Sequence, residues 1–279
     1  MSKQSFLPRL LRNSSGAIGL VLIAIFLLAA ILGALGPTPF PSSEQHAKDR
    51  MQAPSATYRL GTDEFGRDVF SRIIRGATNS LRIALLSVAL ATVLGTFLGT
   101  VAGYVGGKAD NLIMRIMDLF FAFPAILLAM AIVAALGPGA NNTVLAIAVV
   151  YMPIFARVAR GPVLSVKGME FVTAARSVGV RDTRILGRHI LPNITAPLIV
   201  QISLALSWSI LTEAGLSFLG LGAQPPEPSW GSMLSEARSL LELAPWMSIY
   251  PGVAIMLCVL GFNLLGDGLR DVLDPRLRS

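Results

Sequence analysis

The longest stretch of the chain without a charged residue runs from Leu119 to Ala156. As a single helix it would reach about 57 Å at about 1.5 Å per residue, whereas the hydrocarbon core of a bilayer is about 30 Å thick. The stretch must therefore fold back on itself. Gly137 to Asn142 supplies the turn, because Gly and Pro end helices and Asn tolerates turns. The sequence thus predicts two membrane spans, at 115–136 and 142–160.

Four further apolar segments have the length of a membrane span, at 17–36, 83–106, 194–221 and 247–265. Only 14% of the residues are charged, compared with about a quarter in soluble domains. We therefore expect an all-α polytopic membrane protein with about six transmembrane helices. A cleaved signal peptide is the alternative for 17–36, but that run is longer than the apolar core of a signal peptide, so a retained anchor is expected. Gly95, Gly99 and Gly103 have the spacing of close helix packing.

The formal net charge is +7, which in a soluble protein would suggest a nucleic-acid partner. Six spans instead place both termini on one side of a membrane. Segments on that side hold most of the 23 Lys and Arg residues, from Lys3 to Arg276 and Arg278, so the positive-inside rule predicts that both termini are cytoplasmic. Membrane orientation then accounts for the positive charge, and we expect no nucleic-acid partner. One cysteine, Cys258, and two histidines exclude a disulfide framework and give no plausible metal cluster.

The first outer segment, residues 37–82, begins with the prolines Pro37, Pro39 and Pro41, which disfavour regular structure. Further along it, apolar residues recur at the spacing of one helix face, with arginines elsewhere: Phe65, Val69, Phe70, Ile73 and Ile74, and Arg67, Arg72 and Arg75. This pattern predicts an interfacial amphipathic helix that leads into the second span. A solvated charged face is the alternative.

The inner loop 161–192 carries ordered helix signals as well as basic residues. Ala174 and Ala175 fall in an expected short helix that Gly179 can end in the left-handed conformation. Asp182 is then placed to cap a second short helix, which Leu191-Pro192 closes. Two short helices joined at a glycine would form a compact knob that could enter a groove on a soluble partner. A plain basic loop would explain the charge but not this order of helix-starting and helix-ending residues.

The loop resembles the EAA loop of ABC-transporter permeases, which reads Glu-Ala-Ala, three residues, Gly, nine residues and an Ile-x-Leu-Pro ending. Thr173 stands at the Glu position and His189 departs from the usual aliphatic residue. The resemblance implies that an ATPase contacts Glu170, Thr173, Ala174, Ala175, Gly179, Asp182, Leu191 and Pro192. Four further motifs are similar to the dipeptide/oligopeptide permease group, in particular its second, "C" type (DppC/OppC-like) subunit: LGTDEFGRDVFSR, MRIMD, LSFLGLGAQPPEPSW and GFNLLGDGLRDVLDP.

This resemblance implies the type I ABC importer permease fold (MetI-like) in the cell inner membrane. It divides the chain into a cytoplasmic segment 1–16, an anchor 17–36, the outer segment 37–82 and a permease core 83–279. The implied partners are a second homologous permease (DppB/OppB-like), two cytoplasmic ABC ATPases (DppD/DppF-like), an extracytoplasmic solute-binding protein and membrane lipid. The chain itself has no G-x-x-x-x-G-K-[ST] phosphate-binding loop, so we expect no enzyme activity and no cofactor on it, with ATP and Mg²⁺ used by the partner ATPases.

Two polar residues fall within predicted spans. Glu213 either lines the pathway and meets the ammonium end of a peptide, or lies near the outer interface paired with Arg82 or another subunit. Asn263 either lines the pathway or forms a hydrogen bond between helices. The alternative substrates are nickel or a metal chelate and glutathione. A secondary transporter and a membrane protease are the alternatives from other classes, although no internal repeat or buried nucleophile supports them.

Overall fold

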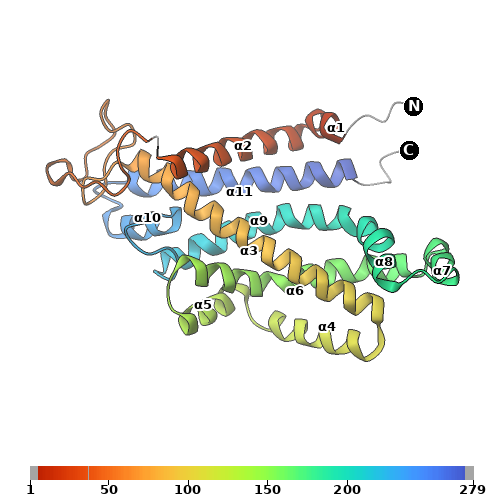
Figure 1. Ribbon diagram of the computed structural model, residues 1–279. Coiled ribbons are helices and arrows are strands. Elements are labelled where there is room, and N and C mark those ends of the chain that lie inside the picture. The colour runs from red at the N-terminus through yellow and green to blue at the C-terminus, as the bar shows by residue number, and fades with distance from the viewer. Residues whose placement is uncertain (1–5, 37, 274–279) are drawn as a thin grey trace.

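The structure is a computed structural model that describes residues 6–36 and 38–273, so Lys3, Pro37, Arg276 and Arg278 lie outside the described residues. Within those ranges the chain is helical and contains no strand, apart from one isolated antiparallel bridge between Thr62 and Asp68. The principal helices, labelled in Figure 1, are α1 (Phe6–Arg12), α2 (Ser14–Leu35), α3 (Val69–Val105), α4 (Gly107–Phe121), α5 (Ala125–Leu136), α6 (Ala140–Lys167), α7 (Glu170–Ser177), α8 (Asp182–Ile185), α9 (Thr195–Phe218), α10 (Trp230–Ala237) and α11 (Trp246–Leu273).

Five helical segments among the described residues are long and apolar enough to cross a membrane, and a sixth candidate is the pair α4 and α5. This agrees with the predicted number of about six. The third predicted span, 115–136, is wrong as a continuous helix, because α4 and α5 meet at 92°. Pro124 precedes α5 directly. A proline has no N–H to donate and disfavours helical backbone at the residue before it, which explains the break at Phe123.

The helix predicted within 37–82 is continuous with the second span rather than separate, because α3 runs for 37 residues from Val69 to Val105. Asp68 begins it by accepting hydrogen bonds from the backbone N–H of Ser71 at 2.9 Å and from the Ser71 hydroxyl at 2.6 Å. Arg72 is only 1% exposed, so it does not belong to a solvated charged face, which was the alternative for this segment. Its ion pairs, described below, compensate for that burial.

Glycines on α3 allow close packing against α6. A Cβ atom at Gly95 would overlap the carbonyl oxygen of Met152, and one at Gly99 would overlap that of Ala156. Only a residue without a side chain lets the two backbones approach so closely, which confirms the packing predicted from the spacing of these glycines. The most extensive helix contact among the described residues is accordingly the one between α3 and α6.

The two ends of the bundle differ in character (Figure 1). The helix α1 and the end of α11 lie at one end, together with α7 and α8, which extend beyond the long helices. The opposite end is covered by α10 and by the irregular segment 38–68. The structure thus provides one end with a projecting helical knob and another with a folded cap.

Candidate functional site

The projecting knob, residues 168–190, consists of α7, α8 and the π-helical turn Leu186–Ile190. Val172, Ile185 and Ile190 have 0% exposure and belong to the main hydrophobic core, so the knob packs against the bundle through them. Its outer surface is apolar in places, with Val178 80% exposed. A rigid knob with an exposed apolar tip and basic neighbours has the properties expected of a docking element.

Gly179 ends α7 as predicted, with a φ angle of +78° in the left-handed region. The N–H of Val180 donates to the carbonyl of Ala175 at 3.1 Å, and the N–H of Gly179 donates to that of Arg176 at 2.9 Å. These two bonds form a Schellman motif, which satisfies carbonyl groups left open at the end of the helix. The local sequence signal therefore sufficed to locate this turn.

Two details of the predicted knob are wrong. Asp182 does not cap the second helix through its side chain: it is the first residue of α8, and its carboxylate instead accepts a hydrogen bond from the hydroxyl of Tyr104 on α3. Leu191-Pro192 does not close that helix either. A 3₁₀ turn at Leu191–Ile194 continues into α9, since the preceding π-helical turn accommodates a proline that cannot donate a hydrogen bond.

Most of the predicted docking residues are accessible to solvent. Glu170 begins α7, where its negative charge interacts favourably with the helix N-terminus. Ala175 is half-buried, and the remaining predicted residues are exposed: Glu170, Thr173, Ala174, Gly179, Asp182, Leu191 and Pro192. Their accessibility leaves them free to contact a second protein.

The link between the knob and α3 was not predicted from the sequence. Besides the Tyr104 hydroxyl bond to Asp182, the ammonium group of Lys167 donates to the Tyr104 carbonyl, and the guanidinium carbon of Arg176 lies 5.1 Å from the Tyr104 ring centroid. Nothing in the local sequence marks Tyr104, because its partners are remote in the chain.

The opposite end holds an ion-pair network, here called the outer clamp, formed by Asp63, Arg67, Arg72 and Glu236. The Nη2 atom of Arg72 donates to both carboxylate oxygens of Glu236 at 3.0 and 2.8 Å, and Arg67 Nη2 donates to the same carboxylate at 2.9 Å. Asp63 lies 2.5 Å from Arg67 Nε and 3.3 Å from Arg72 Nε. The clamp joins the start of α3 to α10.

Trp230 adds an apolar connection at the same end. Its side chain is fully buried; its indole N–H donates to the carbonyl of Ile73 at 3.1 Å, and its backbone N–H donates to Ser80 at 3.2 Å. The Phe26 ring meets it edge-on at 5.5 Å. Trp230 thereby fixes α2, α3 and α10 to one another.

A second carboxylate at this end is more exposed. The guanidinium of Arg75 donates to both oxygens of Glu227 at 3.1 Å, and the Asn79 amide donates to one of them at 3.1 Å. These hydrogen bonds hold the pKa of Glu227 below its usual value.

Of the two polar residues noted within spans, Glu213 is buried within the helical bundle. It has 0% exposure, and the Ser217 hydroxyl donates to its Oε1 at 2.7 Å. Its other oxygen has no hydrogen-bond partner, and its carboxylate no ion pair with Arg82, among the described residues. Asn263 is half-buried in α11, and no side-chain hydrogen bond is found for it within the same ranges. In this conformation Glu213 faces its own chain rather than an open surface.

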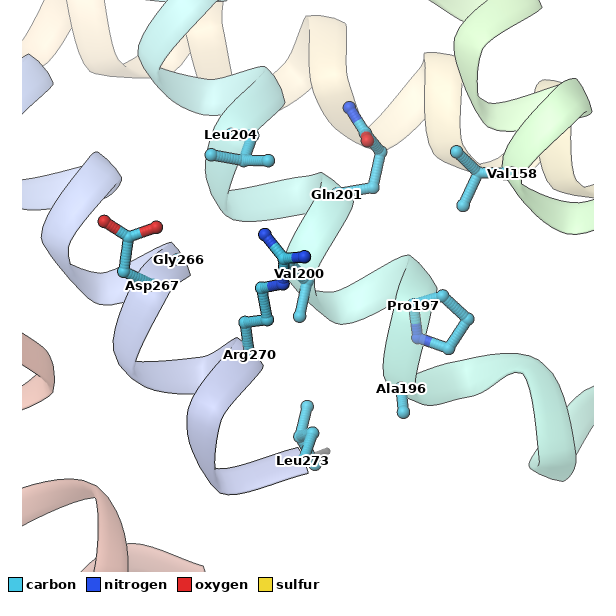
Figure 2. Close-up of a pocket in the computed structure, with 10 residues that line it drawn as sticks. All are labelled: Val158, Ala196, Pro197, Val200, Gln201, Leu204, Gly266, Asp267, Arg270 and Leu273. Atoms are coloured by element: carbon cyan, nitrogen blue, oxygen red, sulfur yellow. The ribbon is translucent and has the colours of Figure 1, made fainter. Parts of the chain in front are cut away.

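A pocket of about 390 Å³ lies between the first half of α9 and the last turns of α11, at the end of the bundle that carries the knob. Figure 2 shows the Arg270 side chain reaching from α11 toward Val200 on α9, with Gln201 nearby and Leu204 one turn further along. The lining of this pocket is mainly apolar. Among all the described residues, no cluster of three or more His, Cys, Asp or Glu side chains could hold a metal ion.

Comparison with known families decides what kind of protein has this architecture. A sequence model described as "Binding-protein-dependent transport system inner membrane component" matches residues 95–279. The chain belongs to this family. This inner-membrane component is 49% identical to the dipeptide transport system permease protein DppC of Alkalihalophilus pseudofirmus, over 97% of its own length and 89% of the relative's. It is 48% identical to the glutathione transport system permease protein GsiD of Pectobacterium atrosepticum, over 98% of its own length and 90% of the relative's.

A solved structure supports the fold of this inner-membrane component independently. The inward-facing MetNI methionine ABC transporter includes a chain that aligns with a TM-score of 0.60 at 17% identity, covering 74% of this chain and 97% of that one. This likeness confirms the predicted type I importer permease fold. The chain is therefore a multi-pass membrane protein of the ABC permease class.

Proposed function

We propose that the chain is the transmembrane permease subunit of an ATP-driven importer of dipeptides and short oligopeptides. The observation that carries this proposal is the knob: a compact helical element that projects beyond the spans, is exposed at its tip, and is hydrogen-bonded to a span remote from it in sequence. Such an element can convert movement of a docked partner into movement of the spans. The peptide substrate is supported by the identity to a dipeptide permease along nearly the whole chain.

In this proposal ATP and Mg²⁺ bind to partner ATPases that dock on the knob, and this chain carries no cofactor and no catalytic residue of its own. The end with α1 and the knob faces the cytoplasm, in line with the excess of basic residues there. The outer end, with α10 and the segment 38–68, faces the solute-binding protein. A second, homologous permease completes the pathway.

Glutathione is the second candidate substrate, because a glutathione permease is 48% identical over 98% of this chain. Glutathione is itself a tripeptide, so the two substrates share a backbone and charged ends. The binding protein and the second permease can therefore select between them without a change in the role of this chain.

The test is uptake by proteoliposomes that contain this chain with its partner permease and ATPases, together with the cognate binding protein. Radiolabelled dialanine, tri-alanine, glutathione and nickel ions are offered separately. The proposal predicts uptake of at least one alanine peptide above that of nickel. Uptake of nickel without uptake of any peptide would contradict it, and uptake of glutathione alone would assign the second candidate.

A further inference from the structure

Tyr104 lies at the point where the knob meets a span that the chain does not connect to it directly. It belongs to the last turn of α3, and its hydroxyl bonds to Asp182, 78 residues further along. The spans that flank the knob in sequence are α6 and α9 instead. A movement of the knob reaches α6 and α9 through the backbone, but it reaches α3 through side-chain contacts such as this one.

Three separate parts of the cytoplasmic end converge on Tyr104. The carboxylate of Asp182 in α8 accepts a hydrogen bond from the Tyr104 hydroxyl. Lys167 at the end of α6 donates to the Tyr104 carbonyl, and Arg176 of α7 lies against the Tyr104 ring. A bond to a charged acceptor is stronger than one between neutral groups, and a ring held from a second side keeps the hydroxyl aimed at its partner. These contacts hold Tyr104, and with it the last turn of α3, against the knob.

The same helix is held at its other end by the outer clamp. Arg72, in the first turn of α3, bonds to Glu236 of α10, and the Ile73 carbonyl accepts from Trp230. Between these contacts and Tyr104, α3 is a single helix without a break. A helix of 37 residues extends over about 55 Å, so it connects the two ends of the molecule as one stiff element.

We propose that Tyr104 is a positioning residue that transmits displacement between the knob and α3, and along α3 to the outer clamp. This inference rests on the proposed function, because it assumes that an ATPase moves the knob. It adds a route by which a binding protein docked at the outer end signals to the ATPases, and a residue outside the knob on which that signal depends.

The experiment measures how far the peptide-loaded binding protein stimulates ATP hydrolysis by the assembled complex in nanodiscs. Tyr104→Phe keeps the ring and its contact with Arg176 but removes the hydroxyl. We expect the stimulation to fall about tenfold or more, because a hydrogen bond to a charged acceptor contributes more than one between neutral groups. Tyr151→Phe is the matched control, because the Tyr151 hydroxyl also lies in a hydrogen bond, with the Thr212 hydroxyl at 2.9 Å, but inside the bundle and outside both the knob and the segment 38–68. This control is expected to keep the wild-type stimulation.

Variants of Asp182 separate transmission from mere stability. Asp182→Asn keeps an oxygen that can accept a hydrogen bond from the hydroxyl but loses the charge, so it should lose less stimulation than Asp182→Ala, which should lose as much as Tyr104→Phe. The double variant Tyr104→Phe with Asp182→Ala should lose no more than either single change, because both remove one interaction. The amount of ATPase that co-purifies reports assembly and should not change.

Wild-type stimulation in Tyr104→Phe, or losses that multiply in the double variant, would overturn the proposal. If Tyr104→Phe does not assemble, the Asp182 pair decides, since equal losses in Asp182→Asn and Asp182→Ala would also overturn it. A wild-type complex without ATP-driven uptake would instead refute the proposed function. The two failures are therefore distinguishable.

Discussion

Arg72 and Glu236 are 164 residues apart in the sequence, yet one guanidinium nitrogen of Arg72 donates to both oxygens of the Glu236 carboxylate, at 3.0 and 2.8 Å. Arg72 is 1% exposed, so its charged guanidinium group is almost completely desolvated. Removing one member of a buried pair leaves the other without compensation, which costs more than the pair itself contributes. The pair consequently makes the outer end sensitive to single substitutions.

The first prediction is that Glu236→Ala destabilises the chain by about 3 kcal/mol, because it leaves both Arg67 and Arg72 with fewer partners. The apparent melting temperature should fall by about 5–10 °C. A thiol-reactive fluorescent dye measures this unfolding, since Cys258 is the single cysteine of the chain and is fully buried. Glu227→Ala is the control: its ion pair with Arg75 is more exposed and should cost less than about 1 kcal/mol. Equal shifts in the two variants would contradict this difference in burial.

The second prediction concerns the turn of the knob. Gly179→Pro should abolish stimulation of ATP hydrolysis by the substrate-loaded binding protein while membrane insertion continues, because proline cannot adopt the positive φ of this turn and lacks the N–H that bonds to Arg176. Gly179→Ala should have a smaller effect, about 1–2 kcal/mol of local strain. Gly187→Ala is the matched control in the knob, since its Cβ would meet no atom within 4 Å. Stimulation is measured in the reconstituted complex, and unchanged stimulation in Gly179→Pro would exclude this role for the turn.

The third prediction concerns the contact of α3 with α6. Gly99→Leu should prevent the two helices from approaching, because even a Cβ atom would overlap the Ala156 backbone. We expect loss of the folded chain from detergent extracts, measured as the monodisperse fraction in size-exclusion chromatography. Gly161→Leu on α6 is the control, since its Cβ would lie in open space. Normal recovery of Gly99→Leu would show that the packing is looser than described.

The fourth prediction follows from the lowered pKa of Glu227, which is caused first by its bonds to Arg75 and then by Asn79. A carboxyl group with a pKa lowered by folding stabilises the protein above its ordinary pKa, and this contribution is lost as the pH falls through the lowered value. The difference in melting temperature between wild type and Glu227→Gln should be constant near neutral pH and should shrink below about pH 4. A difference that grows on acidification would contradict a lowered pKa.

Local signals in the sequence predicted part of this structure well. The lengths of the apolar segments indicated the number of spans, and Gly179 marked the end of α7, because both depend only on neighbouring residues. The bend at Pro124 was missed, since it lies within an uncharged run and the apolar pattern continues on both sides. Composition alone does not distinguish a straight span from a broken one.

Contacts between remote residues were not predictable in the same way. Asp182 has the sequence context of a helix cap, but Tyr104 takes its carboxylate instead. Arg72 has the context of a solvated arginine on an amphipathic helix, but Glu236 of α10 allows it to be buried. In each case a partner from a distant part of the chain decides the role of a polar side chain.

ATP, acting through the knob, is proposed to drive uptake of peptides by a complex containing this chain. The most direct measurement is the accumulation of radiolabelled dialanine in proteoliposomes supplied with the loaded binding protein outside and ATP inside, with the proton and sodium gradients collapsed by ionophores. We expect accumulation against a gradient that requires hydrolysable ATP and is lost in Gly179→Pro. Accumulation that requires an ion gradient and continues without ATP would contradict this function and assign the chain to a secondary transporter.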